Sequence, residues 1–239
     1  MSKPSIRKGS KFNMNHFSPL KVFSLSAAIF MANCTPPELP ATPPADENGH
    51  TLPSEKTMLY QTQVREMLQL DHQQDFIEAN RGLIAQDKHV IVKNSKGHMI
   101  WDTRQYDFIQ GDAPASVNPS LWRQAKLNNI HGLFKVTEGI YQVRGYDLAN
   151  LTIIEGKTGW IIVDTLTSSE TAHSAMALAR KHLNNENHEK PIKAIIYTHS
   201  HIDHFGGVNG ILSSEEAVKN GVRIIAPLGF TEAVTSENL

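Results

Sequence analysis

The sequence predicts a mixed α/β fold in which a helical and hairpin extension precedes a sheet with a crossover helix. Three short strand-like runs, separated by glycine-containing turns, lie between residues 133 and 165. A segment with helical spacing follows, and another apolar run occupies residues 190–198. Strand, helix and strand in this order indicate a buried, parallel strand pair, with the functional loop at the carboxyl end of a strand.

Composition narrows the classes of function and of metal site. The chain has 239 residues, of which 40% are hydrophobic and 20% charged, as in ordinary soluble proteins. A formal net charge of -1 argues against a nucleic-acid partner, which would normally require a basic excess. The lone cysteine, Cys34, excludes an intramolecular disulfide and a cluster of thiolate ligands. Any metal must therefore be held by histidine and carboxylate.

The first 33 residues have the pattern of a signal peptide. Basic residues precede an apolar run over residues 22–32, which is shorter than the roughly 20 residues that span a bilayer. Export to a bacterial periplasm or cell envelope is therefore expected. Cys34 and a Pro-rich linker over residues 34–56 follow, so the region resembles a lipoprotein signal in which Cys34 is acylated and tethers the chain to a membrane. The alternative is a disordered extension with an inert Cys34.

Residues 57–132 are predicted to form the extension. Apolar residues at helical spacing predict two helices, the first beginning near Lys56 and the second continuing through Leu83 and Ile84. Residues 89–103 predict a hairpin with NSKG as its turn. None of these segments has catalytic spacing.

The remaining domain is predicted over residues 133–239. Its strand-like runs are LFKVTEGIYQVRG, NLTIIEG and TGWIIVDT. The crossover helix is expected to begin with a capping box between Thr167 and Glu170, and KPIKAIIYT is the next strand.

The stretch THSHIDHFGG at the end of that strand has the residue types of a metal site. Alternate residues of an extended segment point the same way, so His199 and His201 can face one metal ion. A turn then directs Asp203 and His204 toward a second, nearby position. Nitrogen and carboxylate donors suit Zn²⁺, although iron and manganese also accept them. Gly206 and Gly207 are expected to allow a tight turn.

This stretch resembles the metallo-β-lactamase superfamily, whose HxHxDH signature is matched by His199, His201, Asp203 and His204. The resemblance implies the N-terminal half of an αβ/βα sandwich over residues 133–239. It also implies that Asp164, at the end of WIIVD, supports the metal ligands without binding the metal. Alternatively, Asp164 is a strand-end residue that binds backbone amides.

Longer stretches, residues 118–168 and 198–211, resemble the alkyl sulfatases that hydrolyse dodecyl sulfate. That resemblance implies two Zn²⁺ per complete site, one on His199 and His201 and the other on Asp203 and His204, with the last two also catalytic. It implies hydrolysis of a small linear alkyl sulfate to alcohol and sulfate by a metal-activated water. A homodimer is implied for the full-length form.

One departure from the family affects the expected activity. No histidine follows His204, although the family takes further ligands, including a bridging carboxylate, from the second half of its fold. Helical or exposed positions are expected for the remaining glutamates, Glu215, Glu216, Glu232 and Glu237. The chain is therefore expected to be an inactive N-terminal fragment of such an enzyme. The alternatives are a β-lactam or thioester hydrolase of the same superfamily, or a noncatalytic zinc-binding envelope lipoprotein.

Overall fold

The computed structural model describes Ala45, residues 51–184 and residues 190–238. The predicted signal peptide, Cys34 and most of the predicted linker lie outside the described residues. Within the described ranges, no helix has both the length and the apolar character needed to cross a membrane.

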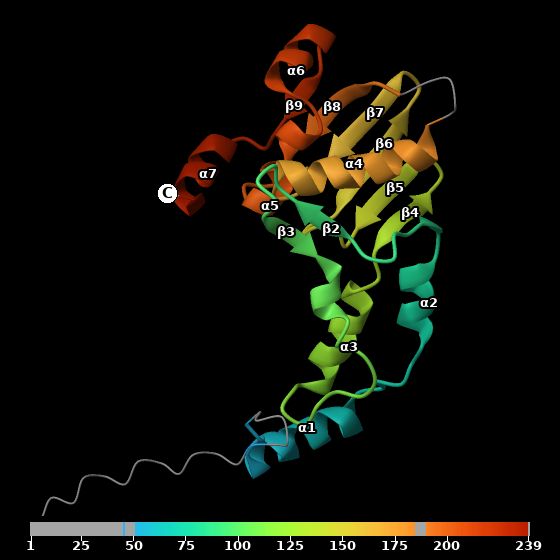
Figure 1. Cartoon of the computed structure of the whole chain (residues 1–239), viewed down its shortest axis with the longest axis vertical. Coiled ribbons are helices and arrows are strands. Elements are labelled where there is room, and N and C mark those ends of the chain that lie inside the picture. The colour runs from blue at the N-terminus through green and yellow to red at the C-terminus, as the bar shows by residue number, and fades with distance from the viewer. Residues whose placement is uncertain (1–44, 46–50, 185–189, 239) are drawn as a thin grey trace, which may run out of the picture. The chain divides into compact units, whose positions relative to one another are not determined.

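A seven-stranded sheet organises the described chain, with strand order β1-β4-β5-β6-β7-β8-β9 (Figure 1). Strands β4 to β7 form an antiparallel meander, and β8 and β9 then add in parallel to β7 and β8. The strands are β1 (Leu83–Ala85), β4 (Gly132–Thr137), β5 (Ile140–Arg144), β6 (Leu151–Gly156), β7 (Gly159–Val163), β8 (Ile192–Ile196) and β9 (Arg223–Ile225). The predicted parallel pair is therefore β7 and β8.

Helix α4 (Ser169–Leu183) is the predicted crossover between β7 and β8, and it lies across one face of the sheet (Figure 1). Its cap is one residue later than predicted, because the capping box joins Ser168 to Thr171 and not Thr167 to Glu170. Thr167 is occupied elsewhere: its amide and hydroxyl both donate to the Asp147 carboxylate, at 3.0 and 2.6 Å.

The hydrophobic core lies between α4 and the sheet. Alternate strand residues face the helix, and they are buried against its alanine-rich side. The strand residues include Leu151, Ile153, Trp160, Ile162 and Ile195, and the helix residues include Ala172, Ala175, Met176 and Ala179. The predicted mixed α/β architecture is confirmed.

The other face of the sheet, here called the outer face, carries apolar side chains that are only partly buried. Strand register places Ile154 beside Ile161, and Val163, Ile196 and Ile225 in a row on this same side. The first four are partly exposed and Ile225 is 37% exposed, so none of the five belongs to the core cluster.

The extension contains α1 (Glu55–Met67), α2 (Gln74–Asn80), the 3-10 helix η1 (Thr103–Tyr106) and α3 (Pro119–Asn128). Strands β2 (Ile91–Lys93) and β3 (Met99–Asp102) form the predicted hairpin. In its turn, the Asn94 side chain accepts hydrogen bonds from the amides of Lys96 and His98.

Two predictions for the elements next to β4 were wrong. The second helix does not continue through Leu83 and Ile84, because Gly82 has a φ of 77° and the chain then pairs with β4 as strand β1. A β-carbon at Gly82 would lie 2.2 Å from the Lys135 carbonyl oxygen, so glycine permits this pairing. The run from residue 133 to 145 is not one strand, since a turn at Gly139, with a φ of 72°, divides it into β4 and β5.

Candidate metal centre

The HxHxDH stretch lies just beyond the end of β8. His199 and His201 occupy the loop after Ile196, and His201 is the N-cap of the short helix α5 (Ile202–Phe205). Asp203 and His204 lie on α5 itself. The sequence predicted that His199 and His201 lie in an extended segment. The structure instead places both in a loop at the carboxyl end of β8, outside the regular strand.

The four predicted ligands lie near one another in pairs. The ring centroid of His199 lies 4.6 Å from that of His201 and 4.0 Å from that of His204. His204 Nε2 lies 3.3 Å from Asp203 Oδ2. His201 is exposed, whereas the other three are partly buried. Across the described ranges, no three His, Cys, Asp or Glu side chains converge as a metal-binding group, so the assignment of these residues as ligands stays a prediction.

Asp164 lies beneath this cluster, at the carboxyl end of β7, and is only 7% exposed. Its Oδ2 lies 2.7 Å from His204 Nδ1, and its Oδ1 accepts a 2.8 Å hydrogen bond from the Thr198 amide. The sequence left two interpretations of Asp164 open, support of a metal ligand and binding of a backbone amide. The side chain makes both contacts, one with the candidate ligand His204 and one with the Thr198 amide.

The backbone at Asp164 is unusual. Asp164 and Leu166 have φ values of 60° and 64°, a left-handed conformation that costs a non-glycine residue about 1 to 3 kcal/mol. Both residues are buried. Packing and the hydrogen bonds of Asp164 must therefore hold this conformation in place.

The glycines of the motif serve close packing and not a turn that needs positive φ. Gly206 and Gly207 have φ values of -62° and -85°. A β-carbon at Gly207, however, would lie 2.1 Å from the Thr165 carbonyl oxygen. The loops after β7 and β8 are also joined by backbone hydrogen bonds from the Thr165 amide to the His204 carbonyl and from the Gly207 amide to the Leu166 carbonyl, at 2.9 and 2.8 Å.

Helix α7 (Phe230–Asn238) contacts the motif from another side. The Ser200 hydroxyl donates a 2.8 Å hydrogen bond to Glu237, and Phe230 stacks on Tyr197 with ring centroids 5.5 Å apart. Burial raises the pKa of the Tyr197 hydroxyl. Sequence reasoning missed these contacts, because no spacing pattern relates residues 30 or more positions apart.

The four glutamates that follow the motif lie at helical and exposed positions, as the sequence predicted. Glu215 and Glu216 lie on α6 (Ser214–Asn220), and Glu232 lies on α7 with Glu237. All four side chains are exposed.

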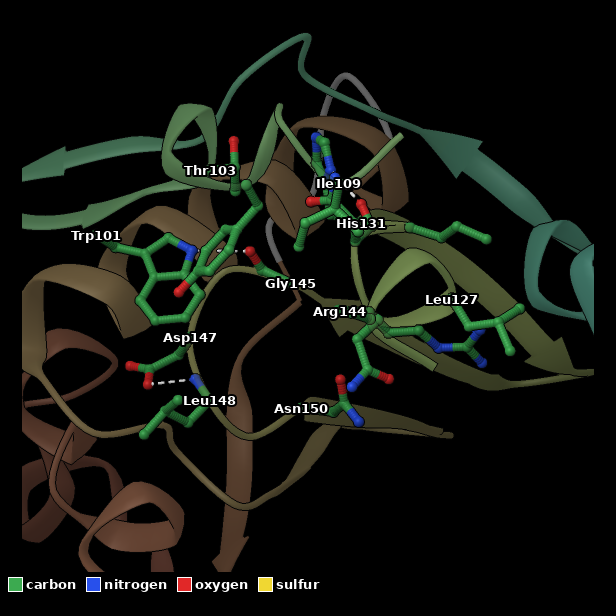
Figure 2. A pocket seen from close by; sticks show the side chains of 15 residues that line it. Trp101, Thr103, Ile109, Leu127, His131, Arg144, Gly145, Asp147, Leu148 and Asn150 are labelled. Atoms are coloured by element: carbon green, nitrogen blue, oxygen red, sulfur yellow. Dashed lines mark hydrogen bonds between the residues drawn. The ribbon is translucent and has the colours of Figure 1, made fainter. Parts of the chain in front are cut away.

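A cavity of about 460 Å³ lies apart from the histidine cluster, and none of the four predicted ligands lines it (Figure 2). It lies between η1, the end of α3 and the loop that joins β5 to β6. The Trp101 indole donates a 2.9 Å hydrogen bond to the Gly145 carbonyl at one wall. Asp147 reaches from this loop to Thr167 and Thr171 at the start of α4. The loop therefore connects the cavity wall to the segment that packs against the metal-binding motif.

Residues 144–237 match the family model of the metallo-beta-lactamase superfamily. This part of the chain is similar to that superfamily. The match contains Asp164 and all four predicted ligands of the metallo-beta-lactamase signature.

Relatives of known sequence extend the similarity into the segments that precede the metallo-beta-lactamase match. An alkyl/aryl-sulfatase of Saccharomyces cerevisiae is 44% identical over 184 residues, which are 77% of this chain and 28% of the relative. A linear primary-alkylsulfatase of Pseudomonas sp. is 50% identical over 174 residues, 72% of this chain and 25% of the relative. An (R)-specific secondary-alkylsulfatase of Pseudomonas sp. is 49% identical over 70% of the chain. The chain spans about a quarter of the length of these relatives.

A solved structure of another alkylsulfatase is also similar to this chain. The stereoselective inverting sec-alkylsulfatase Pisa1 from Pseudomonas sp. superposes with a TM-score of 0.70 and 45% identity. The match covers 78% of this chain and 29% of that protein.

The donor set of this metallo-beta-lactamase region fits the divalent metal that the superfamily implies. Three imidazoles and one carboxylate are ligand types that Zn²⁺ accepts. His204 Nδ1 faces Asp164, which leaves Nε2, the nitrogen on the side of Asp203, available as a donor. Four donors are fewer than two catalytic zinc ions would need, since a catalytic zinc usually has three protein ligands.

Proposed function

We propose that this chain is part of a zinc-dependent alkylsulfatase that hydrolyses linear alkyl sulfate esters, such as dodecyl sulfate, to alcohol and sulfate. The observation that carries the proposal is 44% to 50% identity to three alkylsulfatases over at least 70% of the chain. The superfamily match alone begins at residue 144, whereas the similarity to alkylsulfatases also covers part of the extension.

In this proposal His199 and His201 hold one Zn²⁺, and Asp203 and His204 hold the other and act in catalysis. When bound, such cations lower the pKa of a shared water and offset negative charge on the departing sulfate. The chain's own residues supply orientation. Asp164 accepts a hydrogen bond from the Nδ1–H of His204 and so keeps the Nε2 lone pair of His204 free.

The same donor count supports the proposal that this chain alone does not turn over alkyl sulfates at an enzymatic rate. A zinc ion held by only two protein donors is bound weakly, and its metal-bound water is poorly positioned, because catalytic zinc normally has three protein ligands. The complete site would require further ligands.

We also propose that the chain is exported to the periplasm or cell envelope, with Cys34 as a candidate membrane tether. The support is the basic and apolar pattern of residues 1–33 and the position of Cys34 directly after it. A homodimer is proposed for the full-length form by analogy with the family.

A chimera tests the catalytic proposal. This chain replaces the homologous quarter of the Pseudomonas linear primary-alkylsulfatase, to which it is 50% identical. The chimera is expected to release sulfate from dodecyl sulfate in a zinc-dependent way, and His199→Ala in the chimera is expected to abolish release. The matched control is His173→Ala, an exposed histidine on α4.

The substrate class is tested with the same chimera. Initial rates with dodecyl sulfate are compared with those for a cephalosporin and for lactoylglutathione. Faster turnover of either competitor would contradict the alkylsulfatase proposal and favour another hydrolase of the superfamily. Zinc binding with no hydrolysis of any of the three would favour a noncatalytic role.

A further inference from the structure

We propose that Thr198 is a positioning residue that sets the tautomer of His199 and so keeps Nε2 of that ring free to bind metal. The metal-binding half of this inference rests on the proposed function. The Thr198 hydroxyl oxygen lies 2.8 Å from Asp164 Oδ2, 3.0 Å from Asp164 Oδ1 and 2.9 Å from His199 Nδ1. The hydroxyl therefore bridges a buried carboxylate and a candidate ligand.

The single hydroxyl proton decides the direction of this bridge. An ionised carboxylate can only accept hydrogen bonds, whereas an imidazole nitrogen can donate or accept. Bonds to a charged acceptor are also the stronger ones. Thr198 therefore donates a hydrogen bond to Asp164, and its oxygen accepts a hydrogen bond from the Nδ1–H of His199. Because a neutral imidazole carries one proton, His199 Nε2 then holds a lone pair.

The same carboxylate acts on both imidazoles. It contacts His204 Nδ1 directly at 2.7 Å and His199 Nδ1 through the Thr198 hydroxyl. Hydrogen bonds of this kind from outside the ligand set fix the tautomer and orientation of metal-binding histidines. In this arrangement the Nε2 atoms of His199 and His204 are both available as donors.

The backbone of Thr198 is held separately from its hydroxyl, which makes the inference testable by mutation. The Thr198 amide donates a 2.8 Å hydrogen bond to Asp164 Oδ1. Thr198→Val keeps that bond and the β-branched shape but removes the hydroxyl, and Thr198→Ser keeps the hydroxyl. The matched control is Thr137→Val, at an exposed threonine that ends β4.

The first measurement reads the tautomer without any metal. Nitrogen-15 NMR is recorded on the full chain, labelled at histidine and stripped of metal, at a pH of about 8.5, well above the ordinary histidine pKa of about 6.5. The His199 signals are those absent from His199→Gln. We expect His199 to be protonated at Nδ1 in the unmodified chain and in Thr198→Ser, and to shift toward the Nε2 tautomer in Thr198→Val. An Nε2 proton in the unmodified chain overturns the proposal, as does an Nδ1 proton that persists in Thr198→Val.

The second measurement is zinc affinity by competition with a chromogenic chelator. Loss of such an outer hydrogen bond typically weakens metal binding about 10- to 100-fold, which is the loss expected for Thr198→Val. Thr198→Ser and Thr137→Val are expected to match the unmodified chain, and equal affinity for Thr198→Val and Thr198→Ser overturns the positioning role. If the unmodified chain binds too little zinc to measure, because it supplies only two donors per ion, the same variants are compared in the chimera, and the NMR result still decides the tautomer. If Thr198→Val does not fold, Thr198→Ala replaces it.

Discussion

The Asp164 carboxylate lies 2.7 Å from His204 Nδ1 and joins the loop after β7 to helix α5, 40 residues later in the chain. The contact is nearly buried, since Asp164 is 7% exposed. One side chain thus fixes the relative position of the two loops that build the candidate metal centre.

Asp164→Asn is expected to weaken zinc binding by about 10- to 100-fold, because an amide cannot accept as many hydrogen bonds as a carboxylate. It is also expected to lower the free energy of unfolding by about 1.5 to 3 kcal/mol, the range for hydrogen bonds to charged groups. Asparagine tolerates the left-handed conformation at this position, so backbone strain does not confound the result. Chelator competition and urea unfolding measure the two effects. Asp107→Asn, at an exposed aspartate, is the control, and an effect of equal size there would contradict this role for Asp164.

Gly207→Ala is expected to destabilise the chain by about 1 to 3 kcal/mol through overpacking. The new methyl group would lie 2.1 Å from the Thr165 carbonyl oxygen, which belongs to the backbone and cannot rotate away. Urea unfolding compares this variant with Asn209→Ala, at an exposed residue of the 3-10 helix η2 (Val208–Gly210), which follows Gly207 directly. Equal stability of the two variants would show that the loops are not packed as closely as described.

Residues 34–239, purified alone, are expected to self-associate through the outer face. Contiguous exposed apolar surface drives association, and Ile154, Ile161, Val163, Ile196 and Ile225 lie together on that face. Size-exclusion chromatography with light scattering measures the state. Ile161→Lys is expected to reduce association, and Lys193→Ala, at an exposed residue of β8, serves as the control. A monodisperse monomer that also hydrolyses dodecyl sulfate would refute both this prediction and the proposed inactivity of the isolated chain.

Protein recovered from the cell envelope is expected to begin at Cys34 or shortly after it. A signal peptide is removed during export, and residues 1–33 have the basic and apolar pattern of one. N-terminal sequencing and intact mass spectrometry measure the start, and a mass increase at Cys34 would report acylation. Folded protein that keeps Met1 in the cytosol would rule out export.

The sequence predicted best those elements whose burial is periodic. Alternation along β6 and β7 and the alanine spacing of α4 follow directly from which side chains face the core, so these elements were predicted correctly. The short strand β1 was missed, because Leu83 and Ile84 also fit a helical pattern. Its pairing with β4, whose partner residues lie 48 and 51 positions away in the chain, stabilises it as a strand.

For the candidate site, the sequence predicted the residue types and a supporting role for Asp164, but not the other contacts that hold the motif. The HxHxDH spacing predicts His199, His201, Asp203 and His204 as ligands because all four lie within six consecutive positions. The roles of Thr198 and Ser200 were not predicted, because they depend on Asp164 and Glu237, which other elements bring to the motif. Gly207 was predicted as a turn residue, yet its lack of a side chain matters for close packing.

The pairing of β1 with β4 makes the extension a structural part of the sheet and not a separable appendage. An engineered chain that started at residue 133 would leave the backbone amides and carbonyls of β4 unpaired along a free edge. Such edges are templates for pairing with other chains, and natural proteins usually cover or shorten them. The three residues of β1, Leu83–Ala85, therefore protect against edge-to-edge aggregation, a property unrelated to any chemistry at the histidines.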